Sequence, residues 1–215
     1  KTKQDCAAYF RKSLFIVGEI GGNDYNYAFF GGGTPQTLRP LIPLVVQSIA
    51  AAVSTVIEEG AVDVMVPGNL PIGCMTVYLT LFQSSRRRDY DHSNGCLRGY
   101  NAFARAHNSR LSLALQGIRR RHPYARVIYA DYYAAAKPMF HAPNHYGFRD
   151  GAVRACCGGG GAYNFNNSAR CGHRGSTVCP RPSTHANWDG LHLTESAYRH
   201  IAASLIRRHF ASHSQ

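Results

Sequence analysis

The sequence predicts an α/β protein in which helices cover a parallel sheet, and three observations support this fold class. Short apolar segments, typical of buried parallel strands, alternate with longer segments whose apolar residues recur at helical spacing. Each of the first two apolar segments runs into glycines, as a strand does where it feeds a loop. Apolar residues make up 45% and charged residues 17% of the 215, which is a globular composition. Because the sequence contains neither a repeat nor a linker, we expect a single domain over residues 1–215.

The first half of the chain predicts a strand, a helix and a second strand. Residues 14–18 form a short apolar run before glycines. Residues 37–59 keep apolar residues at helical spacing, and Gly60 is a typical stop. Polar residues interrupt the apolar run within this helix, which predicts that it does not cross a membrane. Residues 62–68 repeat the strand-then-glycine pattern.

The second half continues the alternation. Residues 97–121 have an apolar stripe on an otherwise polar helix. Residues 126–131 predict a third strand, and a short helix follows it. Residues 142–187 are rich in glycine and polar residues, which predicts loops. A last helix is expected over residues 195–210, with Thr194 as its N-cap.

Seven cysteines and one glycosylation sequon indicate a secreted chain with disulfides. Four of the cysteines fall within residues 156–179, and Asn166 begins an Asn-Asn-Ser sequon in the same segment. The connectivity is open, and the odd count leaves one thiol over. The candidates for disulfides are Cys74, Cys96, Cys156, Cys157, Cys171 and Cys179.

A zinc site is the alternative use of these cysteines. Its ligands would be Cys157, Cys171, His173 and Cys179. Their spacing matches no common zinc pattern, so disulfides are favoured.

The formal net charge is +12, with arginine runs at residues 86–88, 119–121 and 207–208. Such charge could attract an acidic partner, such as an acidic polysaccharide, phospholipid head groups or nucleic acid. Solvated helix faces and loop ends are the favoured interpretation. No nucleic-acid-binding motif accompanies the charge, so a nucleic-acid partner is not expected.

Two short motifs carry groups suited to acyl chemistry. Asp189 and His192 lie three residues apart before the last helix, where a carboxylate can orient one imidazole nitrogen while the other faces a nucleophile. After the first strand, Gly21 and Gly22 let the backbone turn tightly, and the Asn23 amide can donate to a developing oxyanion. Taken alone, each motif is more often an ordinary turn.

The combination and order of these motifs resemble the plant GDSL esterase/lipase family of the SGNH hydrolase superfamily, over nearly the whole chain. Leu193 stands where many members have proline, which is a mild departure because this position only shapes the turn. The segments that carry the resemblance are Phe15–Tyr25, Val66–Cys74, Cys156-Cys157-Gly158 with Cys171-Gly172, and Trp188–Glu195.

This resemblance implies a three-layer αβα sandwich with a parallel, flavodoxin-like sheet, and a carboxylic ester hydrolase. His192 would be the general base and Asp189 its orienting carboxylate. Asn23 would donate to the oxyanion, and Gly21 would shape that loop. Members are usually secreted and need neither a metal nor an organic cofactor. The substrate would be a small-molecule or polymer-borne acyl ester.

The family's nucleophile is missing from this chain. In the family it is the serine of an N-terminal Gly-Asp-Ser block, and this sequence has neither that block nor a Gly-x-Ser-x-Gly elbow. The chain begins shortly before the family's third block. We therefore expect the serine, at least one oxyanion donor and the N-terminal strand or strands to be absent. Without them, residues 14–18 are expected to expose an apolar edge, leaving the isolated chain poorly stable, prone to aggregation or completed by something else.

Two functions are consistent with this pattern. The favoured one is the C-terminal portion of an ester hydrolase with a Ser-His-Asp mechanism whose serine lies outside this chain. The alternative is a non-catalytic, truncated homologue that binds acidic cell-wall polymers or acyl esters. Among possible substrates, small acyl esters are favoured, because the Trp188–His192 segment and the Gly18-Glu19-Ile20 variant most resemble members that act on them.

Overall fold

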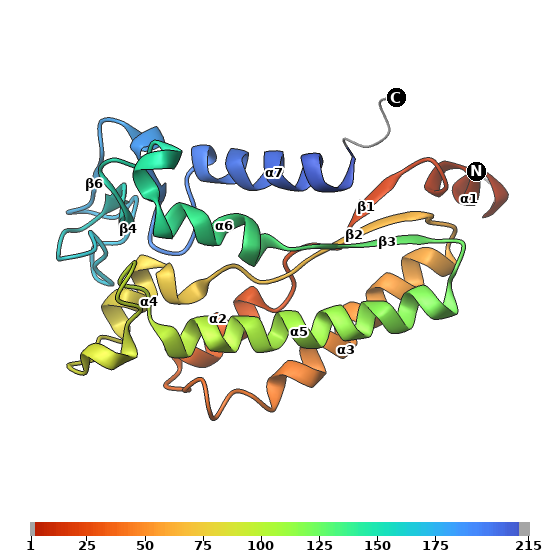
Figure 1. Cartoon of the computed structure of the whole chain (residues 1–215), viewed down its shortest axis with the longest axis horizontal. Coiled ribbons are helices and arrows are strands. Elements are labelled where there is room, and N and C mark those ends of the chain that lie inside the picture. Colours follow the sequence, from red (N-terminus) through yellow and green to blue (C-terminus); the bar gives the residue numbers. More distant parts are fainter. Residues whose placement is uncertain (1–2, 211–215) are drawn as a thin grey trace. The chain divides into compact units, whose positions relative to one another are not determined.

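The computed structural model describes residues 3–210, which form two compact units (Figure 1). The first unit contains the chain up to residue 69 and residues 103–132. The second contains residues 70–102 and the chain from residue 133 onward. Each unit has its own sheet or sheets, so each is described by itself.

The first unit is built on a parallel sheet of three strands. These are β1 (Leu14–Ile16), β2 (Asp63–Pro67) and β3 (Arg126–Ala130), in the order β1-β2-β3 (Figure 1). Both pairings are parallel, with Val64 of β2 opposite Val127 of β3. The predicted parallel α/β arrangement and its three strands are confirmed.

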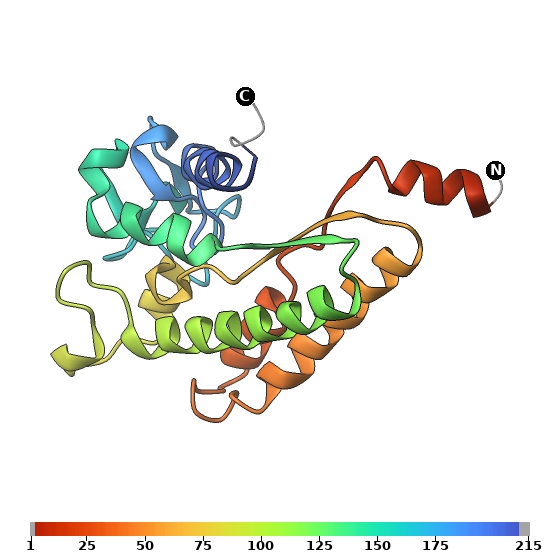
Figure 2. The same ribbon diagram turned by 45° about the vertical axis from the view of Figure 1, so that its right-hand side comes forward.

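Helices α3 (Leu41–Glu58) and α5 (Arg98–Arg121) lie on the same face of this sheet (Figure 2). α3 begins later than predicted, because the preceding residues form turns and Pro40 occupies its N-cap position. The sequence predicts that this helix does not cross a membrane, because polar residues interrupt it. By length and composition alone, however, α3 is long and apolar enough to cross one. Its buried residues form one stripe, as in the core helix of a globular protein. They are Ile42, Val46, Ile49, Val53 and Ile57.

Strand β1 lies at the edge of the sheet and pairs only with β2 among the described strands. Leu14 is 46% exposed and Ile16 58% exposed, while the Phe15 ring packs edge-on against Phe10 at 5.0 Å between centroids. Apolar side chains of a parallel strand are normally covered on both faces. The predicted apolar edge at residues 14–18 is therefore confirmed.

Two helices of the first unit are not evident in the sequence pattern: α1 (Lys3–Phe10) and α2 (Gly22–Phe30). α2 occupies the segment that the glycines and Asn23 mark as a turn. The turn is present but short. Gly21 adopts a left-handed conformation with φ of 99°, and helix α2 starts at the next residue.

The second unit contains α4 (Thr76–Leu81), α6 (Tyr132–His141), whose first residue belongs to the first unit, and α7 (Glu195–His209). α7 begins as predicted, with the Thr194 hydroxyl accepting a hydrogen bond from the Ala197 N–H at 3.2 Å. This agrees with the predicted N-cap.

The loop-rich segment from residue 142 to 187 also contains short strands. β4 (Gly151–Ala155) pairs in parallel with β7 (His185–Asn187), and β5 (Cys157–Gly158) pairs antiparallel with β6 (Thr177–Val178). Strands of two to five residues are too short to show a period of two, so the prediction of loops alone was incomplete.

Three disulfides cross-link the second unit: Cys74–Cys96, Cys156–Cys179 and Cys157–Cys171. Cys6 is free and exposed. All six candidate cysteines are therefore paired. The alternative zinc site is wrong, because its three cysteines are consumed by two disulfides.

Candidate active site

The Asp189/His192 turn directly follows β7. The Asp189 carboxylate accepts three hydrogen bonds within the turn: Oδ1 accepts the backbone N–H of Leu191 at 2.9 Å and of His192 at 2.8 Å, and Oδ2 lies 2.7 Å from His192 Nδ1. Gly190 permits the turn with φ of 106°. The spacing of three residues therefore brings carboxylate and imidazole together.

The electrostatics of the turn favour an ionised Asp189. Burial raises the pKa of this carboxyl, but the hydrogen bonds from the His192 ring and from the backbone N–H groups of His192 and Leu191 outweigh burial and bring the pKa below its usual value. An ionised carboxylate can only accept a hydrogen bond, so Nδ1 carries the proton and donates it to Oδ2, and the lone pair of the neutral His192 ring is on Nε2. The His192 side chain is 64% exposed and that of Asp189 25%. The turn thus presents an oriented base to solvent.

Backbone hydrogen bonds close the turn and anchor it. The Trp188 N–H donates to the His192 carbonyl at 2.8 Å, and the Thr194 N–H donates to the Ala186 carbonyl at 2.8 Å. The disulfide-bonded segment supports the other side, since the Cys156 N–H donates to the Asn187 carbonyl and the Cys157 N–H to the Trp188 carbonyl. The position of the turn is therefore set by the cysteine-rich segment.

Asn187 is a further support that the sequence did not reveal. Its side chain is fully buried, and Nδ2 donates to the Ala152 carbonyl at 2.6 Å and to the Cys74 carbonyl at 3.3 Å. It thus connects β7 to β4 and to Cys74, the last residue of the segment Val66–Cys74. The signal was weak, because a lone asparagine before Trp188 looks like any turn residue.

The predicted oxyanion residues belong to the first unit. Gly21 is buried, and a Cβ there would lie 2.7 Å from Val45 Cγ1, so any side chain would displace the loop. Asn23 lies in the first turn of α2 with its side chain exposed. Gly21 therefore shapes the chain, and Asn23 is available at its surface.

A buried Tyr25–His107 pair lies against Gly21 and is a second feature missed in the sequence. Tyr25 Oη lies 2.8 Å from His107 Nδ1, and both side chains are almost completely buried. The nearest His107 ring atom lies 3.5 Å from the position of a Cβ on Gly21. Burial lowers the pKa of His107 to about 4, so its ring is neutral near pH 7. In the sequence, His107 is only a polar residue on the apolar stripe of α5.

A reciprocal amide pair holds the loop after β2. The Asn69 N–H donates to Asn108 Oδ1 at 2.7 Å, and Asn108 Nδ2 donates to the Asn69 carbonyl at 3.0 Å. Gly68 precedes it, and a Cβ there would lie 2.5 Å from Tyr129 Oη. This close approach explains the glycine.

A serine hydroxyl contacts a histidine ring at Ser93 and His141, with 3.0 Å between Oγ and Nδ1. Asn94 donates its amide to His141 Nε2 at 3.1 Å, and its own Oδ1 is held by the Cys96 N–H. His141 Nδ1 must then carry the proton and donate to Ser93, whose hydroxyl donates to Asp91 at 2.8 Å. No lone pair faces the serine, so this cluster does not supply an activated nucleophile.

Comparison with known proteins identifies the family. Residues 2–205 match the family model described as GDSL-like Lipase/Acylhydrolase. The chain belongs to the GDSL-like lipase/acylhydrolase family. It is 50% identical over 98% of its length to a GDSL esterase/lipase of Arabidopsis thaliana, and 38% identical over 98% to the sinapine esterase of Brassica napus. The matches cover 57% and 54% of those proteins, so the chain spans about half the length of the curated relatives it matches.

Membership of the GDSL-like family confirms the resemblance and its fold class. The matched range includes both the Gly21/Asn23 segment and the Asp189/His192 turn. The three disulfides all lie within it as well. The roles of individual residues in this chain remain predictions.

Proposed function

We propose that this chain supplies the acid–base part of a GDSL-type carboxylic ester hydrolase. The observation that carries the proposal is the hydrogen bond of 2.7 Å between Asp189 Oδ2 and His192 Nδ1, with the ring exposed. It supplies two members of a Ser-His-Asp triad in an orientation that leaves Nε2 for a nucleophile.

In this reaction His192 Nε2 accepts the proton of an attacking serine hydroxyl, and the ionised Asp189 stabilises the resulting imidazolium. The proton then passes to the leaving alcohol, and water hydrolyses the acyl-serine with the same base. The Asn23 amide donates to the oxyanion, and Gly21 keeps the backbone of that segment in place. The serine comes from a segment outside this chain.

Secretion and N-glycosylation at Asn166 are part of the same proposal. Asn166 is exposed, and its Oδ1 accepts the Ser168 N–H at 2.9 Å, so the sequon is accessible. Three disulfides in the second unit support an oxidising compartment.

The substrate we propose is a small acyl ester, free or carried on a polymer. The net charge of +12 would favour ester groups on acidic polysaccharides through attraction that salt weakens. The relative named sinapine esterase supports the small-ester alternative. Hydrolysis of acetylated pectin and of a phenolic choline ester, compared at low and high salt, distinguishes the two.

The test uses an extended chain, meaning this chain preceded by the N-terminal region of the Arabidopsis relative that is 50% identical to it. The extended chain should hydrolyse p-nitrophenyl acetate, and the chain alone should not. His192→Ala should abolish turnover, whereas the control His173→Ala, an exposed histidine of the same unit, should not change it. Full activity of His192→Ala, or activity of the chain alone, would overturn the proposal.

A further inference from the structure

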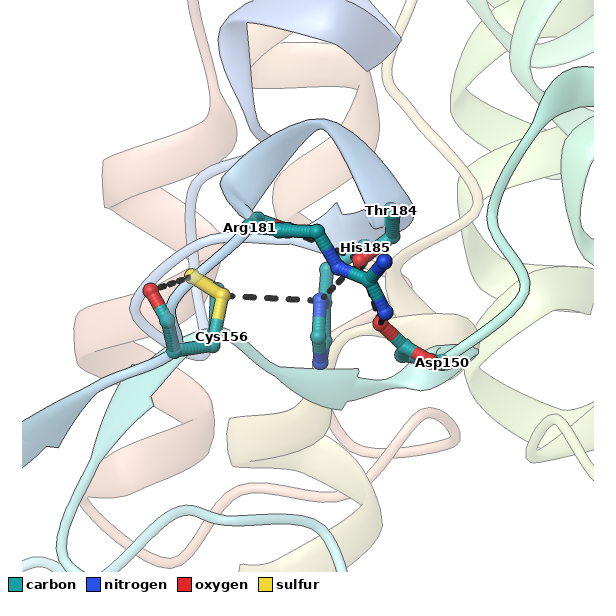
Figure 3. A network of polar contacts seen from close by, with 6 residues as sticks. Asp150, Cys156, Arg181, Thr184 and His185 are labelled. Carbon is teal, nitrogen blue, oxygen red and sulfur yellow. Dashed lines mark hydrogen bonds and ion pairs between the residues drawn. A yellow bond between two sulfur atoms is a disulfide. The ribbon is translucent and has the colours of Figure 1, made fainter.

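A second cluster of reactive side chains lies at the start of β7, away from the residues of the proposed reaction. His185 Nδ1 lies 3.5 Å from the sulfur of Cys179, which is bonded to Cys156 (Figure 3). The three potential ligand atoms all lie within 4.8 Å of one another. Cys156 and His185 are buried, and Cys179 is half-buried. Within residues 3–210, no other group of three such side chains meets this condition.

Among the described residues, no group is left to donate a hydrogen bond to His185 Nδ1, so in the tautomer protonated at Nε2 its lone pair is available to a metal. Its other neighbour is the Thr184 hydroxyl at 3.3 Å. That hydroxyl has one proton and two closer acceptors, Asp150 Oδ2 at 2.5 Å and the Arg181 carbonyl at 2.7 Å. The Thr184 hydrogen bond lowers the pKa of Asp150, so the ionised carboxylate accepts the hydroxyl's hydrogen bond. The hydroxyl therefore has no proton left for His185 Nδ1, and the imidazole lone pair can point at the sulfurs.

We propose that reduction of the Cys156–Cys179 disulfide by a dithiol converts this cluster into a Cys2His site for Zn²⁺ or a similar soft divalent cation. The dithiol gives two electrons and two protons and becomes a disulfide, leaving two thiols. On metal binding both thiols release their protons to solvent, and the ligands are Cys156 Sγ, Cys179 Sγ and His185 Nδ1. The fourth position takes water.

The distances fit a tetrahedral ion with little movement. With Zn–S of about 2.3 Å and Zn–N of about 2.0 Å, ligand sulfur and nitrogen atoms lie roughly 3.5 Å apart. The separation of Cys179 Sγ and His185 Nδ1 is 3.5 Å already. The two sulfurs must separate to about 3.8 Å, and Cys156 Sγ, which lies within 4.8 Å of the imidazole nitrogen, must come to roughly 3.5 Å from it; rotation about the cysteine side chains can supply both changes.

The charge and support around the cluster also suit a cation. Asp150 contributes a carboxylate beside Thr184, and it offsets the charge of Arg181, whose nitrogen lies 3.7 Å away (Figure 3). The backbone of His185 is held by the Thr194 hydroxyl, which donates to its carbonyl at 2.7 Å. A ligand carried on a fixed strand needs little ordering to bind a metal.

The bound ion would replace the cross-link that reduction removes. It would join Cys156, whose N–H supports the Asn187 carbonyl, directly to the first residue of β7. The strand that leads into the Asp189/His192 turn would then keep its anchor in reducing conditions. This inference does not depend on the proposed hydrolase function.

The experiment uses the 215-residue chain with Cys6→Ser, which removes the exposed free thiol. The protein is reduced with dithiothreitol, freed of it under anaerobic conditions and titrated with Co²⁺. We expect one equivalent to bind with the intense visible bands of a tetrahedral ion and a thiolate charge-transfer band, both removed by Zn²⁺. The oxidised protein should show neither band.

Variants locate the site. Cys156→Ser with Cys179→Ser should abolish the bands, and His185→Gln should weaken Co²⁺ binding at least about tenfold. The matched control is Cys157→Ser with Cys171→Ser, which removes the neighbouring disulfide and should leave the bands intact. X-ray absorption of the Zn²⁺ form of the unmutated site should report two sulfur and one imidazole ligand, which keeps the test decisive if a variant fails to fold.

The proposal is overturned if the reduced protein gives no tetrahedral spectrum. It is also overturned if the zinc shell contains no imidazole, or if the Cys157/Cys171 control loses the metal. Equal Co²⁺ binding by the oxidised and reduced proteins would likewise exclude a site that reduction opens.

Discussion

The turn that carries Asp189 and His192 finds hydrogen-bond partners for its carboxylate within its own unit. The edge strand β1 has only one neighbouring strand among the described residues. Every acceptor of the turn's carboxylate has a partner, and disulfide-linked residues hold the strand before it. β1, in contrast, pairs on one side and exposes Leu14 and Ile16. The proposed acid–base pair thus has its partners within its own unit, while the described sheet of the first unit is open at the side of β1, where an additional strand could pair.

The largest effect is expected at the turn itself. In the extended chain, Asp189→Asn should lower kcat by about 10⁴-fold, because an amide no longer selects the tautomer of His192 that leaves Nε2 unprotonated. Glu195→Gln is the control, since Glu195 is an exposed carboxylate of the same segment that pairs with Arg199. Hydrolysis rates of the two variants measure the difference. A loss below tenfold for Asp189→Asn would mean that the carboxylate does not orient the base.

The next largest effect concerns the cross-links of the second unit. Replacing Cys74 and Cys96 by serine removes a disulfide that spans 22 residues, which should cost about 3 kcal/mol of unfolding free energy. Cys6→Ser should cost almost nothing, because that cysteine is exposed and unpaired. Urea unfolding of the two variants checks this. Equal stability of both would indicate that this disulfide does not hold the unit together.

A pH effect of similar or smaller size is expected in the first unit. Burial lowers the pKa of His107 to about 4, below the usual value near 6.5. The unfolded chain therefore binds a proton at this site more readily than the folded one. Stability is full above pH of about 6.5, falls as the pH decreases toward 4, and levels off below that, for a total of at most about 3 kcal/mol.

The measurement is the free energy of unfolding as a function of pH for the unmutated protein and for His107→Phe. Whatever the overall stability of the variant, it should change less between pH 6.5 and 4 than that of the unmutated protein. Tyr25→Phe is the matched control, because it removes the hydrogen bond of 2.8 Å and leaves the imidazole buried. Parallel pH curves for His107→Phe and the unmutated protein would contradict a neutral buried His107.

The sequence predicted long helices with an apolar stripe and strands that are continuous apolar runs, and it missed the other elements. α3 and α5 have the apolar stripe, the three parallel strands lie in apolar runs, and all five were predicted. α2 was missed because Gly21 and Gly22 signal a turn, and only the structure shows that one left-handed glycine starts a helix. β4 to β7 are too short to show alternation.

The candidate site was predicted only where its residues are close in sequence. Asp189 and His192 are three residues apart, so a turn brings them together whatever the remaining fold is. Asn187 and His107 act through partners 35 and 82 residues away, respectively. No local pattern encodes such contacts. The pairing of the cysteines was undetermined for the same reason, since spacing alone allows several connectivities.

The smallest effect on stability is expected at the open edge of the sheet, and it tests directly whether β1 is uncovered. Ile16→Lys should change the unfolding free energy of the chain by no more than about 0.5 kcal/mol, because its side chain is already 58% exposed. Val64→Lys on the neighbouring strand should unfold the unit, because Val64 is fully buried. The same Ile16→Lys change should reduce self-association, since a charge on an edge strand opposes pairing with another chain. Light scattering and urea unfolding measure both effects.

In the extended chain the outcome should reverse: if the added segment covers β1, Ile16→Lys there buries a charge and becomes strongly destabilising. A stability loss of several kcal/mol in the short chain would show instead that the edge is already covered.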